Sequence, residues 1–331
     1  MEQPALLAAT AGLLHDLGKL AQRAGQRPTH SWDSQDRALY KYQHALLSFE
    51  VALQILPEPL QDGLAGIAQH HQSRDGLSWV IAQADRLASS EREDSDAAEP
   101  QALLSPFASV SLAGRTAPQK SFVPLRPLAM HDSALFPASA PSAAEAREAY
   151  RLIWSGFLKE AVALRQAAES SGASLEAWLA NMQQLLKRHA WAVPAAAYQA
   201  IPDISLYDHS RMTAALAACL ALAPGAMSPE GELTTERRTF DIALLVGGDV
   251  SGIQDFIYTI SSRGAASALR GRSFYLQLLT DAAASYLLRV LDLPRTNLVY
   301  ASGGHFYLLA PPGSEETLRE AQRYISRVLL R

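Results

Sequence analysis

Residues 13–20 read LLHDLGKL, and this stretch decides how the N-terminal part of the chain is interpreted. Apolar residues recur here at helical spacing, which predicts a buried helix. The same stretch carries His15 and Asp16, which point about 100° apart around a helix and are normally avoided on a buried face. An imidazole beside a carboxylate in an apolar helix therefore indicates that the pair binds something.

Three later segments of the same region add candidates of the same chemical kind. The segments YQHALLS (42–48), AQHHQS (68–73) and AQADRLASSERE (82–93) each lie on a predicted helix. Four packed helices can bring side chains from each of them to one point. Imidazole nitrogens together with carboxylates suit Mn, Co or Ni better than Mg or Ca, which prefer oxygen ligands alone. The candidate metal ligands are His15, Asp16, His44, His70, His71 and Asp85.

The order of these four motifs resembles that of the HD-superfamily phosphohydrolases. In that family His and Asp ligands hold one or two metal ions that activate water and neutralise phosphate oxygens, and the reaction is hydrolysis of a phosphodiester. The resemblance implies that His15 and Asp16 are ligands, and that Asp85 and one of His70 and His71 complete the site.

Individual members of the set have other interpretations. His44 could be a ligand or a phosphate contact, but a single histidine on a partly apolar helix is often an ordinary core or surface group. Asp85 could instead pair with a neighbouring arginine on a solvated helix face. Lys19, one turn after His15, could reach a substrate phosphate and is therefore a catalytic candidate beside His15 and Asp16.

The composition excludes several classes of protein. Of the 331 residues, 48% are hydrophobic and 19% are charged, a globular balance that excludes a fully disordered chain. Cys219 is the single cysteine, so no internal disulfide forms and a reducing cytoplasm is the expected location. The net charge of −4 gives no global positive field, so a nucleic-acid partner needs a local groove. No signal peptide, membrane span or membrane partner is expected.

The length favours more than one domain, and the chain changes character along its length. Residues 1–94 predict an all-α domain with at least four helices, of which the second spans 39–56. Residues 95–145 hold seven of the 18 prolines, which predicts a linker with an irregular hairpin between 107–112 and 122–125. Further helices are predicted at 143–170, 175–189 and 205–222.

The last part of the chain has a mixed pattern. Strands are predicted at 242–246, 297–301 and 306–309, and helices at 270–291 and 314–330. This βαββα order predicts an α+β, ferredoxin-like domain whose last strand is missing. We therefore expect the sequence to be the N-terminal portion of a longer, multidomain protein.

Glycine-rich turns lie at the ends of the predicted strands. VGGDVSGIQDF (246–256) follows the first strand, and SGGHFYLL (302–309) contains the turn between the other two. Glycine-rich strand ends often bind phosphate. RGRSFYLQLLTD (270–281) places two arginines at a predicted helix start, which is unfavourable for cations unless an anion lies nearby. The alternative is a tight connection with solvated arginines.

Segments spread over nearly the whole chain resemble the large subunit of type III-A CRISPR (Csm) effector complexes. They are LLHDLGKL, ADRLASSERE (84–93), PDISLYDHSRMTAALA (202–217), GGDVSGIQDFIYTISSRGAASALRGRSFYL (247–276) and SGGHFYLL. The resemblance implies an HD nuclease domain in 1–94 that cuts single-stranded DNA, and a first palm domain with preceding helices in 146–331. It also implies guide RNA and other effector subunits as partners, and target RNA as the activator.

In that family a second palm carries the Gly-Gly-Asp-Asp carboxylates that convert ATP into cyclic oligoadenylate. The motif does not occur in these 331 residues, so we expect synthesis only where a second palm is supplied. Asp208 and His209 resemble a family signature near the nucleotide pocket; alternatively, Asp208 caps a helix and His209 is exposed. The implied ATP contacts are Asp249, Ser251, Gly252, Arg270, Arg272, Gly303 and Gly304.

Two other functions fit parts of the sequence. The chain could be a scaffold subunit with a dormant HD site, because the second palm is missing. It could also be a stand-alone HD phosphohydrolase that acts on nucleotides, which fits residues 1–94 but leaves the segment 247–276 unexplained.

Overall fold

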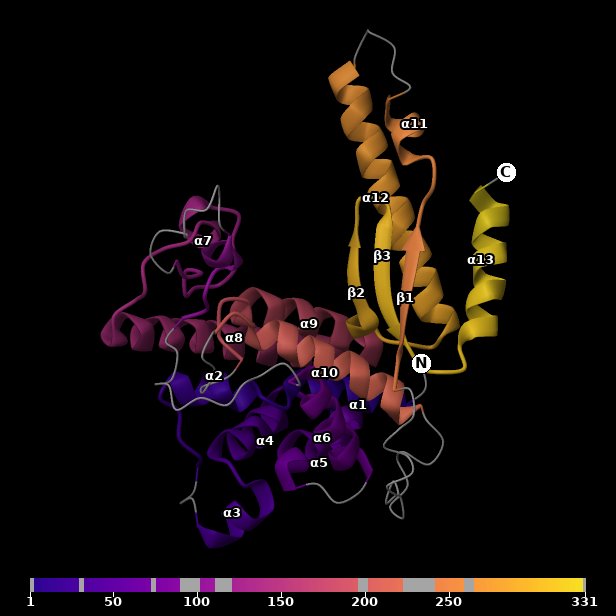
Figure 1. The fold of residues 1–331 in the computed structure, drawn as a ribbon. Coiled ribbons are helices and arrows are strands. Elements are labelled where there is room, and N and C mark those ends of the chain that lie inside the picture. Colours follow the sequence, from indigo (N-terminus) through magenta and orange to yellow (C-terminus); the bar gives the residue numbers. More distant parts are fainter. Residues whose placement is uncertain are drawn as a thin grey trace.

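Figure 1 shows the computed structural model of the chain, in which a group of helices is joined to a small three-stranded sheet. The structure describes residues 3–29, 33–72, 76–89, 102–110, 121–195, 202–222, 242–258 and 265–329. Two parts of the predicted linker, 95–101 and 111–120, lie outside the described residues.

The N-terminal helices are arranged around α1 (Gln3–Leu14), which is buried on nearly all sides. A helix that is apolar around its whole circumference can be stable only inside a core. The sequence predicts that this helix continues through His15 and Asp16, and that prediction is wrong. The helix ends at Leu14, and α2 (Leu17–Arg23) begins after the pair. Asp16 takes the N-cap position of α2 but makes no capping hydrogen bond, so its carboxylate serves other partners.

The helix predicted over 39–56 is also divided. Its parts are α3 (Ser34–Tyr40) and α4 (Gln43–Ile55), with Lys41 and Tyr42 between them. The next elements are η1 (Glu58–Gly63), α5 (Leu64–Gln69), η2 (His70–Gln72) and α6 (Gly76–Ala88).

The segment after α6 is irregular, as its prolines predict. Phe122 forms isolated antiparallel bridges with Leu104 and Ala138. The hairpin predicted to begin at 107–112 is wrong, because η3 (Pro106–Ser109) occupies part of its expected first strand. A proline at the first position of this 3-10 helix favours a turn over a strand.

Three long helices follow the linker, after the short α7 (Asp132–Leu135). They are α8 (Ala143–Ser171), α9 (Leu175–Ala190) and α10 (Leu206–Ala221), and each begins after a serine whose hydroxyl caps its first turn. Helices α8 and α9 pack against each other, and α10 packs against α1 and α6. Although α10 follows the linker, it therefore lies within the N-terminal group of helices (Figure 1). The domain boundaries stay a prediction.

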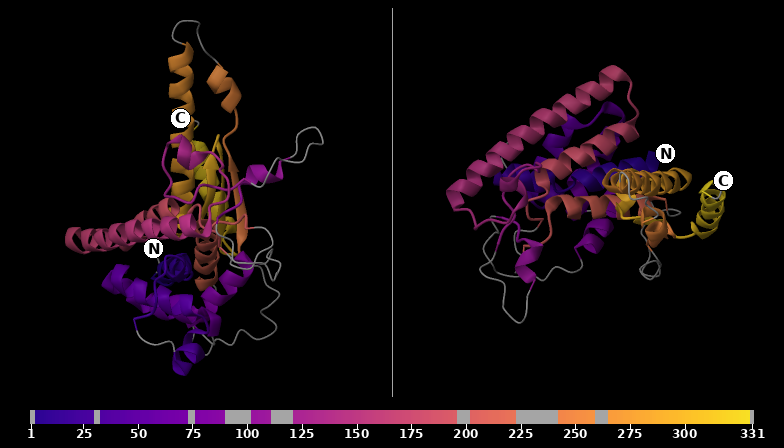
Figure 2. Two further views of the ribbon diagram at one scale, coloured as in Figure 1. Left: turned by 90° about the vertical axis from the view of Figure 1, so that its left-hand side faces the viewer. Right: turned by 90° about the horizontal axis from the view of Figure 1, so that it is seen from above.

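The sheet is antiparallel, with strands in the order β1-β3-β2. Helix α12 covers one face of it, and α13 lies on the side of β1 (Figures 1 and 2). The predicted βαββα order is confirmed, with one short additional helix, α11. The elements are β1 (Leu244–Asp249), α11 (Ile253–Tyr258), α12 (Ala265–Val290), η5 (Arg295–Asn297), β2 (Leu298–Ser302), β3 (His305–Ala310) and α13 (Glu315–Leu329).

Two polar side chains join the sheet to α10. The buried Asn297 donates from Nδ2 to the carbonyls of Ala215, 3.1 Å away, and Leu309, 3.0 Å away. The Arg211 guanidinium donates to the Val299 carbonyl at 2.7 Å. Helix α10 is therefore shared between the helical group and the sheet.

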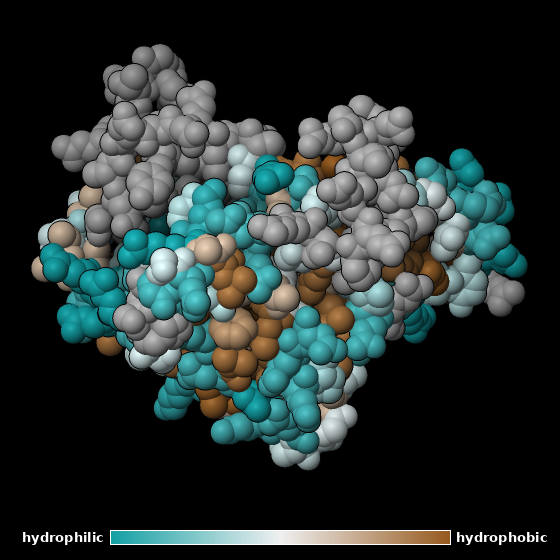
Figure 3. All heavy atoms as spheres, turned by 90° about the horizontal axis from the view of Figure 1, so that it is seen from below, coloured by the Kyte–Doolittle hydropathy of each residue, from teal (hydrophilic) through white to brown (hydrophobic). Residues whose placement is uncertain are grey.

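Figure 3 shows the molecule from below, with apolar patches near the middle of a largely hydrophilic surface. Within the described parts of the chain, every helix is too short or too polar to cross a bilayer.

Candidate metal centre

The turn between α1 and α2 places His15 and Asp16 in the interior, where both side chains are almost fully buried. His15 Nδ1 hydrogen-bonds the Gly12 carbonyl at 2.8 Å. Because a carbonyl can only accept, this contact fixes a proton on Nδ1 and leaves Nε2 to face the neighbouring carboxylates. A ring held in this way is oriented as metal-ligating histidines usually are.

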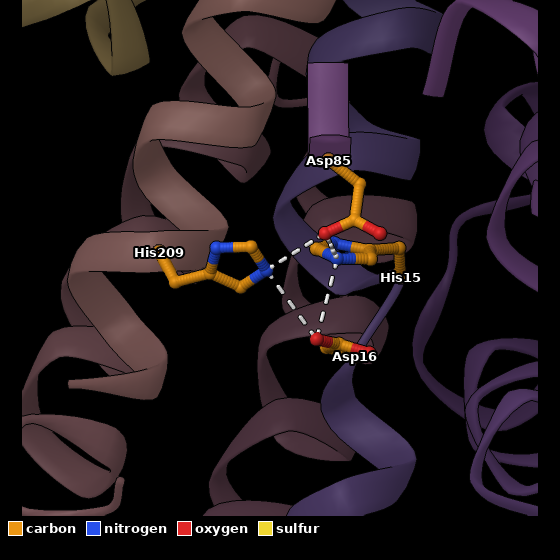
Figure 4. Close-up of side chains that lie close together, drawn as sticks. All are labelled: His15, Asp16, Asp85 and His209. Carbon is orange, nitrogen blue, oxygen red and sulfur yellow. Dashed lines mark ion pairs between the residues drawn. The ribbon is translucent and has the colours of Figure 1, made fainter. Parts of the chain in front are cut away.

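Four side chains from three parts of the fold meet at this point (Figure 4). His15 Nε2 lies 3.4 Å from Asp16 Oδ2 and 3.5 Å from Asp85 Oδ1. His209 Nε2 lies 3.4 Å from the same Asp16 oxygen and 3.1 Å from the same Asp85 oxygen. One ligand atom from each of the four lies within 4.8 Å of all the others. When several ligand atoms each lie about 2.0–2.2 Å from one ion, the distances between those atoms are similar to the distances found here.

Two glycines beside the turn allow other helices to approach it closely. A Cβ on Gly12 would lie 2.8 Å from the Cα of Ala214 on α10, so only glycine permits this contact. A Cβ on Gly18 would collide with the backbone of α4 at His44. The first contact brings α10, and with it His209, against α1. The second brings α4 against α2.

A second group of histidines adjoins Asp16. Ligand atoms of Asp16, His70 and His71 lie within 4.8 Å of one another. His44 Nε2 lies 3.6 Å from Asp16 Oδ1 and 3.0 Å from His71 Nε2. His70 Nδ1 donates to the Ile67 carbonyl at 3.0 Å, which leaves its Nε2 for a ligand. Asp16 thus belongs to both groups.

The two carboxylates supply the negative charge that a cation would bind. Burial alone would raise the pKa of Asp85, but the imidazoles of His15 and His209 beside it hold that pKa below its usual range. Burial would also raise the pKa of Asp16, and the nearby charge of Lys19 is the largest effect that lowers it instead. Both carboxylates are therefore ionised at neutral pH.

The histidines differ in their protonation. Burial lowers the pKa of His44 to about 3, of His70 to about 4 and of His71 to about 2. These rings are neutral at pH 7 and offer lone pairs. Burial acts on His15 in the same direction, but the two nearby carboxylates outweigh it and raise its pKa to about 10. His15 therefore holds a proton that a bound cation would displace.

The unpaired atoms of these groups fit a divalent cation. Among the described residues, the buried atoms without a hydrogen-bond partner include His15 Nε2, Asp16 Oδ1, His70 Nε2 and both ring nitrogens of His209. A buried polar atom left without a partner costs roughly 1–3 kcal/mol. Imidazole and carboxylate ligands together suit a borderline divalent transition metal, which would satisfy these atoms at once.

The six residues that the sequence singles out as metal ligands all lie in these two groups. Lys19 forms an ion pair with Asp16. A contact between Lys19 and a substrate phosphate stays a prediction, and it requires the ammonium to exchange partners.

His209 is the residue that the sequence placed wrongly. We expected it near a nucleotide pocket or exposed, whereas it is 1% exposed and belongs to the cluster. Ser205, and not Asp208, caps α10. The available signal was the run of alanines after His209, because small residues predict close helix contact, here with the alanine-rich α1.

The glycine-rich turns form a far more open site. Asp249 Oδ1 lies 3.0 Å from His305 Nε2, and the two side chains are 59% and 56% exposed. Gly303 and Gly304 make the turn between β2 and β3 with positive φ. A cavity of about 790 Å³ begins at Asp249 and Ser251 and continues between α12 and α13, where its lining is mostly apolar.

The two arginines predicted at a helix start do not lie there. Helix α12 begins at Ala265, because the small and apolar residues before Arg270 extend it, and both arginines fall in its second turn. Arg272 donates to the Phe256 carbonyl and lies over the Phe256 ring. Neither Arg270 nor Arg272 is among the described residues that line the cavity. The helix dipole therefore gives no reason to expect an anion at these arginines.

Comparison with known proteins identifies the relatives of this chain. Residues 242–331 match the family model for Csm1 subunit domain B. The CRISPR system single-strand-specific deoxyribonuclease Cas10/Csm1 (subtype III-A) of Methanocaldococcus jannaschii is 30% identical over 357 aligned positions, which cover 96% of this chain and 42% of that protein.

Solved structures give the same result. The apo Csm1-Csm4 cassette matches with a TM-score of 0.68 and 25% identity, over 97% of this chain and 41% of that chain. The Csm1-Csm4 cassette in complex with AMPPNP matches with a TM-score of 0.62 and 26% identity, over 96% and 41%. This chain thus spans about two fifths of the length of its relatives. The chain belongs to the Cas10/Csm1 family of subtype III-A CRISPR systems.

Proposed function

We propose that the helical part of this chain is a metal-dependent nuclease for single-stranded DNA, acting as the HD domain of a type III-A CRISPR large subunit. The observation that carries the proposal is the convergence of His15, Asp16, Asp85 and His209 within ligand distance of one ion. The relative from Methanocaldococcus jannaschii is named a single-strand-specific deoxyribonuclease, which supports this substrate class.

The four residues would hold one divalent ion, such as Mn, Co or Ni, and Asp16 with His70 and His71 offers a second position. A bound ion of this kind supplies an activated water and neutralises phosphate oxygens. Within the chain, the Gly12 carbonyl orients His15, and burial shields His15, Asp16, His70 and His209 from bulk water. Lys19, at the edge of the cluster, would contact a substrate phosphate.

Cleavage of a labelled single strand tests the proposal. The full chain is incubated with single-stranded DNA and Mn²⁺ or Ni²⁺, beside a His15→Ala/Asp16→Ala variant. We expect cleavage by the wild type and none above background by the variant. Equal cleavage by both would defeat the proposal. Faster turnover of nucleoside monophosphates or cyclic dinucleotides than of DNA would favour a stand-alone phosphohydrolase. Absence of bound metal in elemental analysis would favour a dormant scaffold.

We also propose that the sheet and its helices form a first palm domain that contacts ATP. Asp249 faces His305 beside the Gly303–Gly304 turn, and a relative has been solved with AMPPNP, an ATP analogue. Ser251 and Gly252 lie in the turn after β1. Synthesis of cyclic oligoadenylate would need a second palm, and guide RNA, target RNA and other effector subunits would be the partners in the cytoplasm.

Equilibrium binding of ATP tests this second proposal. An Asp249→Ala variant should bind ATP with altered affinity in titration calorimetry, whereas the His15→Ala/Asp16→Ala variant should bind it as the wild type does. Identical binding by the Asp249→Ala variant and the wild type would remove Asp249 from the site.

A further inference from the structure

Helices α3 and α4 are joined by Lys41 and Tyr42 in an unusual backbone conformation. Lys41 has φ 64° and ψ −45°, and the Tyr42 amide donates to the Tyr40 carbonyl at 2.7 Å. These values describe a γ-turn with positive φ, which is rare and strained for a residue that has a side chain. Such strained turns cluster at functional sites, so the side chains that this turn presents are candidates for a function.

The turn presents its two tyrosines to different environments. Tyr40 is buried, and its ring centre lies 6.1 Å from that of Phe49. Tyr42 keeps 44% of its surface exposed. The buried ring anchors the turn, and the exposed ring is left accessible from solvent.

The exposed ring lies directly against the metal-site histidines. Tyr42 stacks on His44 with 9° between the ring planes and 5.5 Å between the centres. It meets His71 edge to face at 4.7 Å. His44 Nε2 in turn lies 3.6 Å from Asp16 Oδ1. Tyr42 therefore contacts two candidate metal ligands directly, and one imidazole ring separates it from Asp16.

Cationic side chains accompany this ring. Lys41 Nζ lies over the Tyr42 ring, 5.1 Å from its centre, and Lys19 forms an ion pair with Asp16. Proteins that bind single strands regardless of sequence combine positive groups along the backbone with aromatic rings on which bases stack. The turn and the metal centre together offer both kinds of group, an aromatic ring and two ammonium groups.

From this geometry we infer that Tyr42 is a stacking platform for a base of single-stranded DNA bound beside the metal centre, with Lys41 at the strand's backbone. The inference rests on the nuclease proposed above and adds a positioning residue to it. Tyr42 holds the strand but supplies no ligand atom and no proton. Because every base has a flat face, such a platform would suit a nuclease that accepts any sequence.

Binding without turnover tests the platform. The metal-free full chain, kept in EDTA, is titrated into a fluorescent single strand and followed by anisotropy. A Tyr42→Ala variant should bind about tenfold more weakly, whereas Tyr42→Phe, which keeps the ring, should stay within about twofold of wild type. A Tyr324→Ala variant removes an exposed tyrosine on α13 and should bind as the wild type does.

A strand of equal length with all bases removed isolates the stacking. Wild type and Tyr42→Ala should bind this abasic strand equally. Equal weakening on both strands, or no weakening on either, would overturn the inference. So would a loss of Mn²⁺ affinity in Tyr42→Ala, because Tyr42 would then act by supporting His44. These readouts need no cleavage, so failure of the platform is distinguishable from failure of the nuclease, which is judged by cleavage with Mn²⁺.

Discussion

The metal centre and the glycine-rich turns both pair a histidine with an aspartate, but in opposite surroundings. His209 and Asp85 approach to 3.1 Å inside the helical group, and His305 and Asp249 approach to 3.0 Å at an exposed strand end. An exposed ion pair contributes only about 0–1 kcal/mol, because water competes for both partners. Burial of an ion pair costs much more free energy, because both charges lose their water and further hydrogen bonds must replace it.

The difference indicates how far the surrounding protein encloses each site. In the metal centre, the α1–α2 turn, α6 and α10 surround the ligand atoms. Several of the imidazole nitrogens have no hydrogen-bond partner there and are available to bind an ion. At the strand ends, Asp249 and His305 have solvent on most sides. The first site is enclosed by elements of this chain, whereas the second is open to solvent.

Single alanine substitutions of His209 and His305 should show the largest difference between the two regions. We expect His209→Ala to lower Mn²⁺-dependent cleavage of single-stranded DNA by at least about a hundredfold, because it deletes a ligand, and His305→Ala to change it less than about twofold. Cleavage rates under single-turnover conditions measure both. His189→Ala is the matched control, since His189 is also buried among the helices but lies outside both ligand groups. Comparable losses in the His305 and His209 variants would erase the distinction.

The pH dependence of metal binding should show the second-largest difference between the two sites. In the metal-free protein the pKa of His15 is raised from 6.5 to about 10. Protonated His15 therefore stabilises the folded apo protein below pH 6.5, and this contribution is lost as the pH rises through 10. Because the ion must displace that proton, Mn²⁺ affinity should rise about tenfold per pH unit between pH 7 and 9. Titrations at fixed ionic strength measure it, and His305→Ala should keep the slope. A flat profile would mean that His15 is neutral before metal binds.

Alanine at two glycines should reveal a smaller contrast in stability. Gly18→Ala places a Cβ against the backbone of α4, which cannot yield locally, so we expect a loss of about 3 kcal/mol in the free energy of unfolding. Gly303 has φ 62° but open space around it, so alanine there should cost only about 1 kcal/mol of backbone strain. Urea unfolding of both variants checks the difference. Equal losses would show that α2 and α4 can separate without cost.

The six candidate residues of the cluster and the βαββα order could be recognised in the sequence because both depend on local patterns. Helical spacing, strand alternation and the order of motifs are all visible in short windows of sequence. Polar groups such as His15 and Asp16 in an apolar context signal a ligand wherever the helix ends. Such signals survive errors of a few residues in the element boundaries.

What could not be predicted depends on contacts between distant segments. His209 reaches the centre because Gly12 admits the backbone of α10 at Ala214, and the alanines after His209 do not specify which helix they contact. The break after Leu14 has a similar origin, since Asp16 occupies the N-cap position of α2 while its side chain forms ion pairs with His44 on α4 and His209 on α10. Tertiary contacts outweigh local helix propensity at both places.

The link between the two regions carries the smallest expected effect. Arg211 lies two residues after His209 on α10, and its guanidinium donates to the Leu298 and Val299 carbonyls of β2. Arg211→Met keeps the apolar stem but removes these bonds, so we expect a loss of about 1–2 kcal/mol in unfolding free energy. Cleavage should change less than about twofold if α10 is held at the metal centre by Gly12 and α6 alone. A drop in cleavage as large as that of His209→Ala, with Mn²⁺ affinity also reduced, would show instead that the sheet positions His209. The two regions would then be one unit, and the contrast between an enclosed site and an open one would no longer describe separate parts of the molecule.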